Sequence, residues 1–215
     1  MGPTAIAKDY CGLREDEGTP WRVAASYGWL SSELRFGSTS APFYQRSVAV
    51  SLTRQLGERF SVQVGAGAVI GGGIEAGDVD YTMQPGWLVR LGGTWLALDG
   101  RGAWPFVAVS LGLAASGVAA TALGAPSEPL TALDVGLSAS VGKALFGAVA
   151  PYLGARVFGG PVAWTLAGKA VTGTDVDHWQ VAFGVAASLP LGLDVLVEWA
   201  PFGERSAVAQ AGWAF

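Results

Sequence analysis

The side chains best suited to catalysis lie in two short acidic segments of the chain. The first holds Asp78 and Asp80, and the second holds Asp175, Asp177 and the only histidine, His178. Two carboxylates can orient and activate a water molecule, and a histidine held by a carboxylate can act as a general base. These segments are therefore candidates for a hydrolytic site. The alternative interpretation is that they are acidic because they belong to loops that face water.

The composition indicates what kind of scaffold would carry such residues. Of 215 residues, 51% are hydrophobic and only 14% are charged, whereas soluble domains carry about 25% charged residues. The 32 glycines disfavour long helices, because each interior glycine costs about 1 kcal/mol relative to alanine. The chain is thus as apolar as a membrane protein but lacks the composition of a helical one. Its net charge of −4, with no basic stripe, argues against nucleic acid as a partner.

The chain offers few residues for disulfides, metals or targeting. The single cysteine, Cys11, excludes an intrachain disulfide and a multi-thiolate metal site, and we expect no cofactor and no metal. Residues 1–10 lack the apolar core and cleavage pattern of a signal peptide.

The longest uncharged stretch, residues 102–127, could be taken for a transmembrane helix because it exceeds the roughly 20 residues that such a helix needs. It contains Pro105, Pro126 and four glycines, however. Between residues 107 and 114, large apolar residues alternate with small ones, which is the pattern of a strand. We therefore favour a strand, and a helical inner-membrane protein is the weaker alternative.

The same alternation recurs in ten segments of about the length that a tilted transmembrane strand needs. They are residues 21–30, 43–54, 59–70, 82–98, 107–114, 130–142, 149–158, 178–189, 193–200 and 206–215. This pattern predicts an all-β fold, a transmembrane antiparallel up-and-down β-barrel of ten strands, with eight or twelve as alternatives. The barrel would comprise residues 21–215, and residues 1–20 would form an N-terminal periplasmic tail.

The connections between these segments alternate in length. Those at residues 55–58, 99–103, 143–148 and 190–192 are short, and those at 31–42, 71–81, 117–129 and 159–177 are long. One connection, at 201–205, departs from the alternation because it is short. Bacterial barrels have short periplasmic turns and longer external loops, so both termini are expected on the periplasmic side.

Tryptophans gather near the ends of the segments, which is typical of aromatic girdles at the two lipid interfaces. The predicted girdle comprises Trp29, Trp87, Trp95, Trp104, Trp179, Trp199 and Trp213. The final segment alternates and ends in Phe215, with Trp213 on the same face. This ending resembles the last strand of bacterial outer-membrane barrels, which the barrel assembly machinery reads. The resemblance implies an outer-membrane location, with the lipid bilayer, lipopolysaccharide, the assembly machinery and other envelope proteins as partners.

Six charged residues are expected to point into the lumen, three of each sign: Arg22, Arg90, Asp134, Arg156, Asp194 and Glu198. A balanced set suggests mutual pairing rather than a selectivity ring of one sign. Barrels of about eight strands are filled by side chains and porins of 16–18 strands are open, so a barrel of ten would conduct little.

The two acidic segments also resemble part of the omptin pattern, a family of ten-stranded outer-membrane proteases. Asp78 and Asp80 match the Asp-x-Asp pair of that family. The second pair does not match, since Asp177 is adjacent to His178 and Asp175 lies three residues before it. Omptins also have tall strands above the membrane, which the ten segments are too short to supply. We therefore predict a non-enzymatic, porin-like narrow pore or a structural, complex-forming component, with a rim-site hydrolase as the alternative.

Overall fold

The computed structural model describes residues 21–123, 126–166 and 168–215. The predicted N-terminal tail, residues 1–20, lies outside the described residues. Among the described residues, no helix is long and apolar enough to cross a membrane. Residues 106–121 of the uncharged stretch form a strand, so the helical alternative is wrong.

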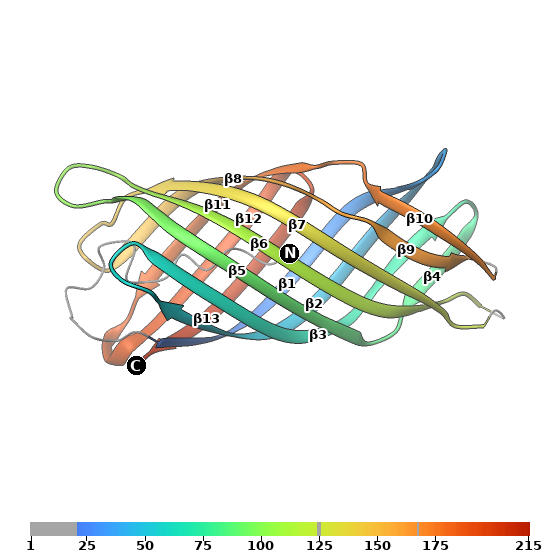
Figure 1. Cartoon of the computed structure of the whole chain (residues 1–215), viewed down its shortest axis with the longest axis horizontal. Helices are drawn as coiled ribbons and strands as arrows, with labels where there is room; N and C mark the ends of the chain where they lie inside the picture. The colour runs from blue at the N-terminus through green and yellow to red at the C-terminus, as the bar shows by residue number, and fades with distance from the viewer. Residues whose placement is uncertain (1–20, 124–125, 167) are drawn as a thin grey trace.

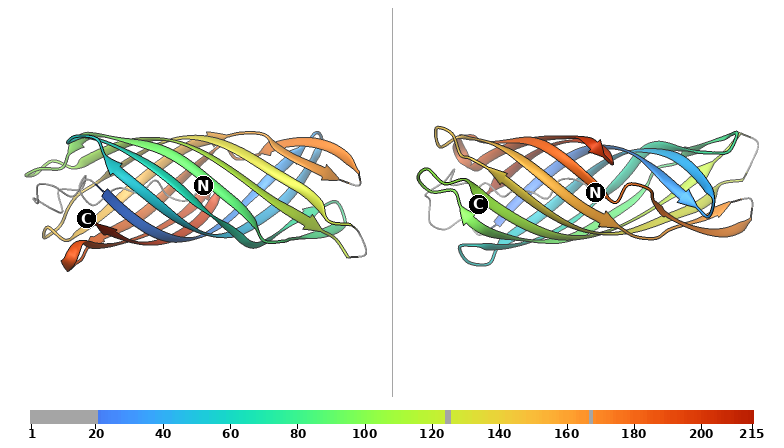
Figure 2. Two further views of the ribbon diagram at one scale, coloured as in Figure 1. Left: turned by 60° about the horizontal axis from the view of Figure 1, so that its bottom comes forward. Right: turned by 90° about the horizontal axis from the view of Figure 1, so that it is seen from above.

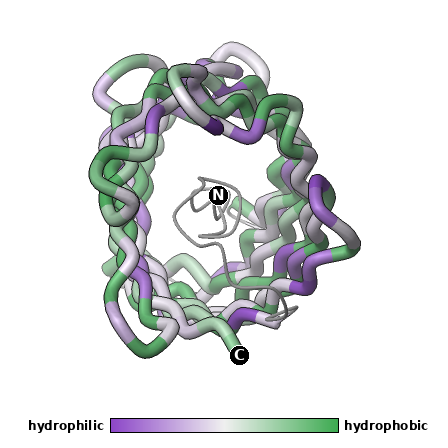
Figure 3. The backbone as a smooth tube through the Cα atoms, turned by 90° about the vertical axis from the view of Figure 1, so that its left-hand side faces the viewer, coloured by the Kyte–Doolittle hydropathy of each residue, from purple (hydrophilic) through white to green (hydrophobic). Residues whose placement is uncertain are grey.

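The described chain is an all-β structure with one closed antiparallel sheet (Figure 1). Its strands are β1 (Trp21–Phe36), β2 (Thr39–Gln55), β3 (Phe60–Ala76), β4 (Val79–Met83), β5 (Gly86–Asp99), β6 (Phe106–Thr121), β7 (Glu128–Gly142), β8 (Val149–Gly159), β9 (Val162–Leu166), β10 (Lys169–Asp175), β11 (Trp179–Ser188), β12 (Leu193–Gly203) and β13 (Arg205–Ala214). All strands slope in the same sense around the barrel, and an end-on view shows the wall closing on itself (Figures 2 and 3). The prediction of an antiparallel barrel is confirmed.

The number of strands in the wall differs between the two ends. We call the end that carries Trp21 and Phe215 the near end and the opposite end the far end. At the near end the ring has ten strands, β1-β2-β3-β5-β6-β7-β8-β11-β12-β13, and β13 pairs with β1. At the far end β10 pairs with β1 instead, which gives an eight-stranded ring, β1-β2-β3-β4-β6-β7-β9-β10. The barrel narrows because the β12–β13 hairpin stops short.

Strand lengths show how far the far end projects. A strand advances about 3.3 Å per residue, and transmembrane strands tilt by about 40°. The 11 residues of β12 therefore span about 28 Å of barrel height, close to the apolar band of about 25 Å in outer-membrane barrels. The 16 residues of β1 span about 40 Å by the same arithmetic. The far third of the wall thus extends beyond the band.

This projection corrects our expectation for the long connections. Residues 31–42 and 71–81 lie almost entirely in strands, and residues 159–177 contain β9 and β10. In the fourth long connection, the described residues 122–123 and 126–127 lie outside the strands. The prediction that the strands are too short to rise above the membrane is therefore wrong.

The reason for the error is a reversal of polarity along the strands that reach the far end, as β1 shows. In the near two thirds of β1, Tyr27 faces outward and is exposed, while Arg22 faces the lumen and is buried. In the far third, Glu33 faces outward, and Leu34 is buried inside. The period of two continues unbroken, but the apolar face moves from the outside to the inside. The pattern of outward apolar residues therefore ends before the strand ends.

A closely packed junction between strands lies where the β12–β13 hairpin ends. The Val176 amide donates to the Glu33 carbonyl at 2.8 Å, and the Glu204 amide donates to the Trp179 carbonyl at 3.1 Å. Gly203 has a φ of +72°, and a Cβ built on it would lie 2.0 Å from the Trp179 carbonyl oxygen. The junction therefore accepts only glycine at position 203.

Replacing Gly203 with alanine is expected to destabilise the barrel by more than 1 kcal/mol, because the new methyl group meets backbone atoms and the residue must adopt a left-handed conformation. Gly77→Ala is the matched control, since its φ is +62° but an added Cβ meets nothing within 4 Å. Urea unfolding of both variants in the same detergent measures the difference. Equal losses would show that the close approach at Gly203 carries no cost beyond its φ.

Candidate functional site: the lumen

The interior of the barrel is layered along its axis. Near the termini lies an apolar cluster of Leu96, Phe106, Ala108, Ala150, Tyr152, Ala186 and Leu196. Most polar and charged side chains lie at mid-height, but Arg22 and Asp194 lie at the near end, since each is the second residue of its strand. The far end is filled by a second apolar cluster, which we call the far plug: Leu34, Ala41, Ile74, Met83, Ala120, Leu130, Val162 and Trp164. The lumen therefore changes from polar to apolar before the wall ends.

The first ion pair lies at the near end and joins β1 to β12. Arg22 Nε donates to Asp194 Oδ2 at 2.9 Å, and Arg22 Nη2 donates to Asp194 Oδ1. The Gln210 side-chain oxygen, in the amide orientation that satisfies both partners, accepts from Nη1 and Nη2 of Arg22 at 2.9 and 3.0 Å. The side chains of Arg22 and Asp194 are only 4% and 8% exposed, so this pair is almost fully desolvated.

A second ion pair belongs to a longer polar chain. Arg156 Nη2 donates to Asp134 Oδ2 at 2.7 Å, and Nη1 donates to the Gln180 side-chain oxygen at 3.2 Å. The Gln180 amide nitrogen donates in turn to the Ser206 hydroxyl at 3.0 Å. These bonds link β7, β8, β11 and β13 across the inside of the wall. They hold the Arg156 guanidinium in one orientation.

The remaining two lumen charges bind hydroxyl groups. The Tyr152 hydroxyl donates to Glu198 Oε2 at 2.6 Å, and Arg90 Nη2 donates to the Ser26 hydroxyl at 2.9 Å. The six predicted lumen charges thus form two ion pairs, and Arg90 and Glu198 do not pair with each other among the described contacts. Since positive and negative groups are interleaved, the polar layer presents no ring of a single sign.

The far plug is organised around Trp164. The indole ring lies 5.6 Å from the ring of Phe36 and 4.9 Å from that of Tyr81, the latter edge to face. Trp164 is 2% exposed, and Ile74 beside it in the plug is 1% exposed. Aromatic rings from β1, β4 and β9 therefore meet inside the lumen, in the part of the wall that has eight strands.

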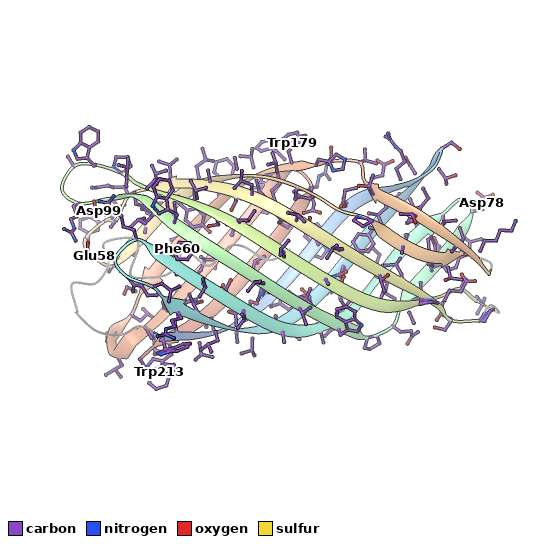
Figure 4. The ribbon with its side chains drawn as sticks, in the orientation of Figure 1. Glu58, Phe60, Asp78, Asp99, Trp179 and Trp213 are labelled. Atoms are coloured by element: carbon purple, nitrogen blue, oxygen red, sulfur yellow. The ribbon has the colours of Figure 1, made fainter. Side chains whose placement is uncertain are left out.

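The structure does not bring the predicted catalytic residues together. Asp78 lies in the turn between β3 and β4 at the far tip, and Figure 4 shows it far along the axis from Trp179, the neighbour of His178. Within the eight-stranded ring, β4 and β10 are four strands apart in either direction, so they lie on opposite sides. Asp80 and His178 are exposed, and Asp175 accepts a hydrogen bond from Ser32 at 3.1 Å.

The tryptophans predicted for the girdle differ in exposure. Trp87, Trp95, Trp104, Trp179, Trp199 and Trp213 are exposed on the outer surface, whereas Trp29 is half-buried. Figure 4 shows Phe60 and Trp213 toward the near end and Trp179 closer to the middle. Their role at the lipid interfaces remains a prediction.

Sequence reasoning missed two residues that line the interior of the candidate site. Trp164 lay within a predicted loop, and Glu204 lay within a predicted turn, where an acidic residue is normally exposed. In the structure Glu204 is 4% exposed and its carboxyl group faces the lumen. The alternation of Val162 and Trp164 with Ala163 and Thr165 is a sequence signal for the inward face of β9. No comparable signal marks Glu204, because its burial depends on how β10 closes onto β1.

Comparisons with known proteins support the fold. No family model matches the chain, and no curated protein matches its sequence. Among solved structures, the chain is similar to the translocator domain of the autotransporter NalP from Neisseria meningitidis (TM-score 0.53, 13% identity, 95% of this chain and 91% of that chain). It is also similar to the outer membrane protease OmpT from Escherichia coli (TM-score 0.54, 10% identity, 94% of this chain and 100% of that chain).

A third similar structure is an outer membrane channel from Pseudomonas putida (TM-score 0.50, 9% identity, 99% of this chain and 100% of that chain). The fold is therefore that of bacterial outer-membrane β-barrels. Because a translocator, a protease and a channel share this fold, the fold does not distinguish among their functions.

Proposed function

We propose that the protein is an integral component of the bacterial outer membrane, that it is not an enzyme, and that it acts as a structural or complex-forming barrel rather than as a narrow pore. The observation that carries this proposal is the far plug. At the level of the far plug, buried aliphatic and aromatic side chains among the described residues fill the lumen and present an apolar barrier to a polar solute. The near end would face the periplasm and the projecting far third would face outward, where lipopolysaccharide surrounds it.

The closed lumen predicts that the protein reconstituted into a planar bilayer gives no steady single-channel current. Shortening two plug residues in the variant Leu34→Ala/Met83→Ala is expected to raise conductance above the wild-type level. The matched variant Leu56→Ala/Leu98→Ala changes two exposed leucines and should leave conductance unchanged. Regular current steps from the wild-type protein would overturn the closed-barrel proposal.

Apolar side chains on the near rim support a complex-forming role. Each of the four near-end turns carries an exposed large hydrophobic residue: Leu56, Trp104, Phe146 and Leu191. Phe146 and Leu191 also have left-handed backbone conformations, with φ values of +54° and +63°. Such conformations cost about 1 kcal/mol or more for residues other than glycine. Exposed apolar groups held at this cost suit contact with another envelope protein.

The C-terminal residues support recognition by the barrel assembly machinery. Trp213 and Phe215 face outward, and their ring centroids are 5.1 Å apart. Both are about half exposed at the near end, so the assembled barrel leaves them accessible.

The hydrolase alternative requires Asp78, Asp80 and His178 to act on one substrate. Because β4 and β10 lie on opposite sides of the far ring, the geometry gives this alternative little support. Cleavage of a surface peptide that is abolished by either His178→Ala or Asp80→Ala would nevertheless establish it.

A further inference from the structure

A cavity lies inside the lumen directly below the far plug, where the ring narrows from ten strands to eight. Its volume is about 90 Å³, which is room for a few water molecules or for one organic ion smaller than benzene, because a cavity that holds benzene measures about 150 Å³. Most of its wall is apolar and includes Leu34, Phe43, Leu88 and Phe158. Three carboxyl groups also line it, those of Asp134, Asp175 and Glu204, and they come from three different elements.

These carboxyl groups are incompletely neutralised. Asp134 binds Arg156 through Oδ2, and Asp175 accepts one hydrogen bond from Ser32. Glu204 is 4% exposed, and among the described residues its Oε1 atom has no hydrogen-bond partner; the same holds for Asp134 Oδ1. The cavity thus has three acidic groups facing it and one guanidinium beside it. A buried carboxylate without a partner is costly unless a cation or proton compensates it.

The pKa of Glu204 reflects the same excess of negative charge around the cavity. Glu204 lies in the turn after β12, beyond the membrane-spanning part of that strand. Burial raises the pKa of Glu204 to about 7, the carboxylates of Asp175 and Asp134 raise it as well, and Arg156 opposes them. Burial also raises the pKa of Asp175 above its usual range. Either a proton or an external cation would therefore be favoured here.

We propose that this cavity binds a small organic ammonium ion with an apolar body. The ammonium group would lie between Glu204 and Asp175, and the apolar body would contact Phe43 and Phe158. The Arg156 guanidinium already lies 4.6 Å from the centroid of the Phe158 ring, so this ring is left to contact the apolar body rather than the ammonium group. The site goes beyond the proposed function, since a closed structural barrel requires no ligand, and conductance does not test it.

The test is calorimetric titration of the full chain in detergent at pH 8 with propylammonium, and with 1-propanol as a neutral probe of similar size. Propylammonium is expected to bind at least about tenfold more tightly than 1-propanol, a difference of about 1.4 kcal/mol. Its affinity should fall as the pH is lowered from 8 to 6, because propylammonium stays charged while Glu204 gains a proton. Equal binding of the two probes, or no binding, would mean that the cavity holds only water and protons and would overturn the proposal.

Single-residue variants test whether the ammonium ion binds at these carboxyl groups. Glu204→Gln is expected to weaken propylammonium binding at least tenfold, and Asp175→Asn serves as a second variant if Glu204→Gln folds poorly. Glu75→Gln is the matched control, since Glu75 is exposed on β3 at the far end. Unchanged affinity in well-folded Glu204→Gln protein would also overturn the proposal. The two probes and the pH series decide it in the wild-type protein even if neither variant folds.

Discussion

Replacing Trp164 with alanine is expected to lower the free energy of unfolding by about 3–5 kcal/mol, the range observed when a buried aromatic side chain is truncated in a packed core. Trp164 is 2% exposed and contacts the rings of Phe36 and Tyr81, so its removal leaves a cavity among side chains from three strands. These strands belong to the eight-stranded part of the wall, which has its own apolar interior and water on the outside.

Urea unfolding in detergent, followed by far-UV circular dichroism, measures this change. Trp104→Ala is the matched control, because Trp104 is 72% exposed at a near-end turn. We expect the control to change stability by less than about 1 kcal/mol. If the two variants lose the same stability, the far plug does not act as a packed core, and the closed-lumen proposal loses its main support.

Removing one partner of the buried ion pair in Asp194→Ala is expected to cost about 3–5 kcal/mol, because it leaves the Arg22 guanidinium buried without a counter-charge. Gln210 can supply an acceptor to Arg22, but a neutral amide cannot replace the charge. The expected loss is therefore much larger than that for an ion pair on the surface, which contributes at most about 1 kcal/mol.

Two further variants separate charge burial from packing. Arg22→Met/Asp194→Leu removes both charges at once and is expected to recover most of the stability lost in Asp194→Ala. Asp99→Ala breaks the exposed pair between Asp99 and Arg101, whose side chains are 38% and 84% exposed, and should change stability by less than about 1 kcal/mol. A double variant as unstable as Asp194→Ala would argue that the site stabilises through packing alone.

The alternation of side chains was enough to predict the near two thirds of the barrel. Along β12, Val195 and Val197 face outward while Asp194 and Leu196 face inward, and all four are placed as the period of two requires. The same period, repeated with short turns between segments, predicted ten antiparallel strands because lipid on one side and a lumen on the other impose opposite polarity on successive residues. The pairing of Arg156 with Asp134 also follows from inward faces of neighbouring strands.

The far third could not be predicted in this way, because its polarity depends on what surrounds the wall. An outward Glu33 and an inward Leu34 are the polarity expected of a barrel wall surrounded by water. The alternation of a strand surrounded by lipid has the opposite polarity, with apolar residues outward. Only the tertiary structure shows that β10 pairs with β1. This pairing closes an eight-stranded ring at the far end, beyond the β12–β13 hairpin. That long-range pairing buries Glu204 and fills the lumen with Trp164. The same pairing places Asp78 and His178 on opposite sides of the barrel. Their relative position depends on the closure of the ring, because they lie nearly 100 residues apart in sequence.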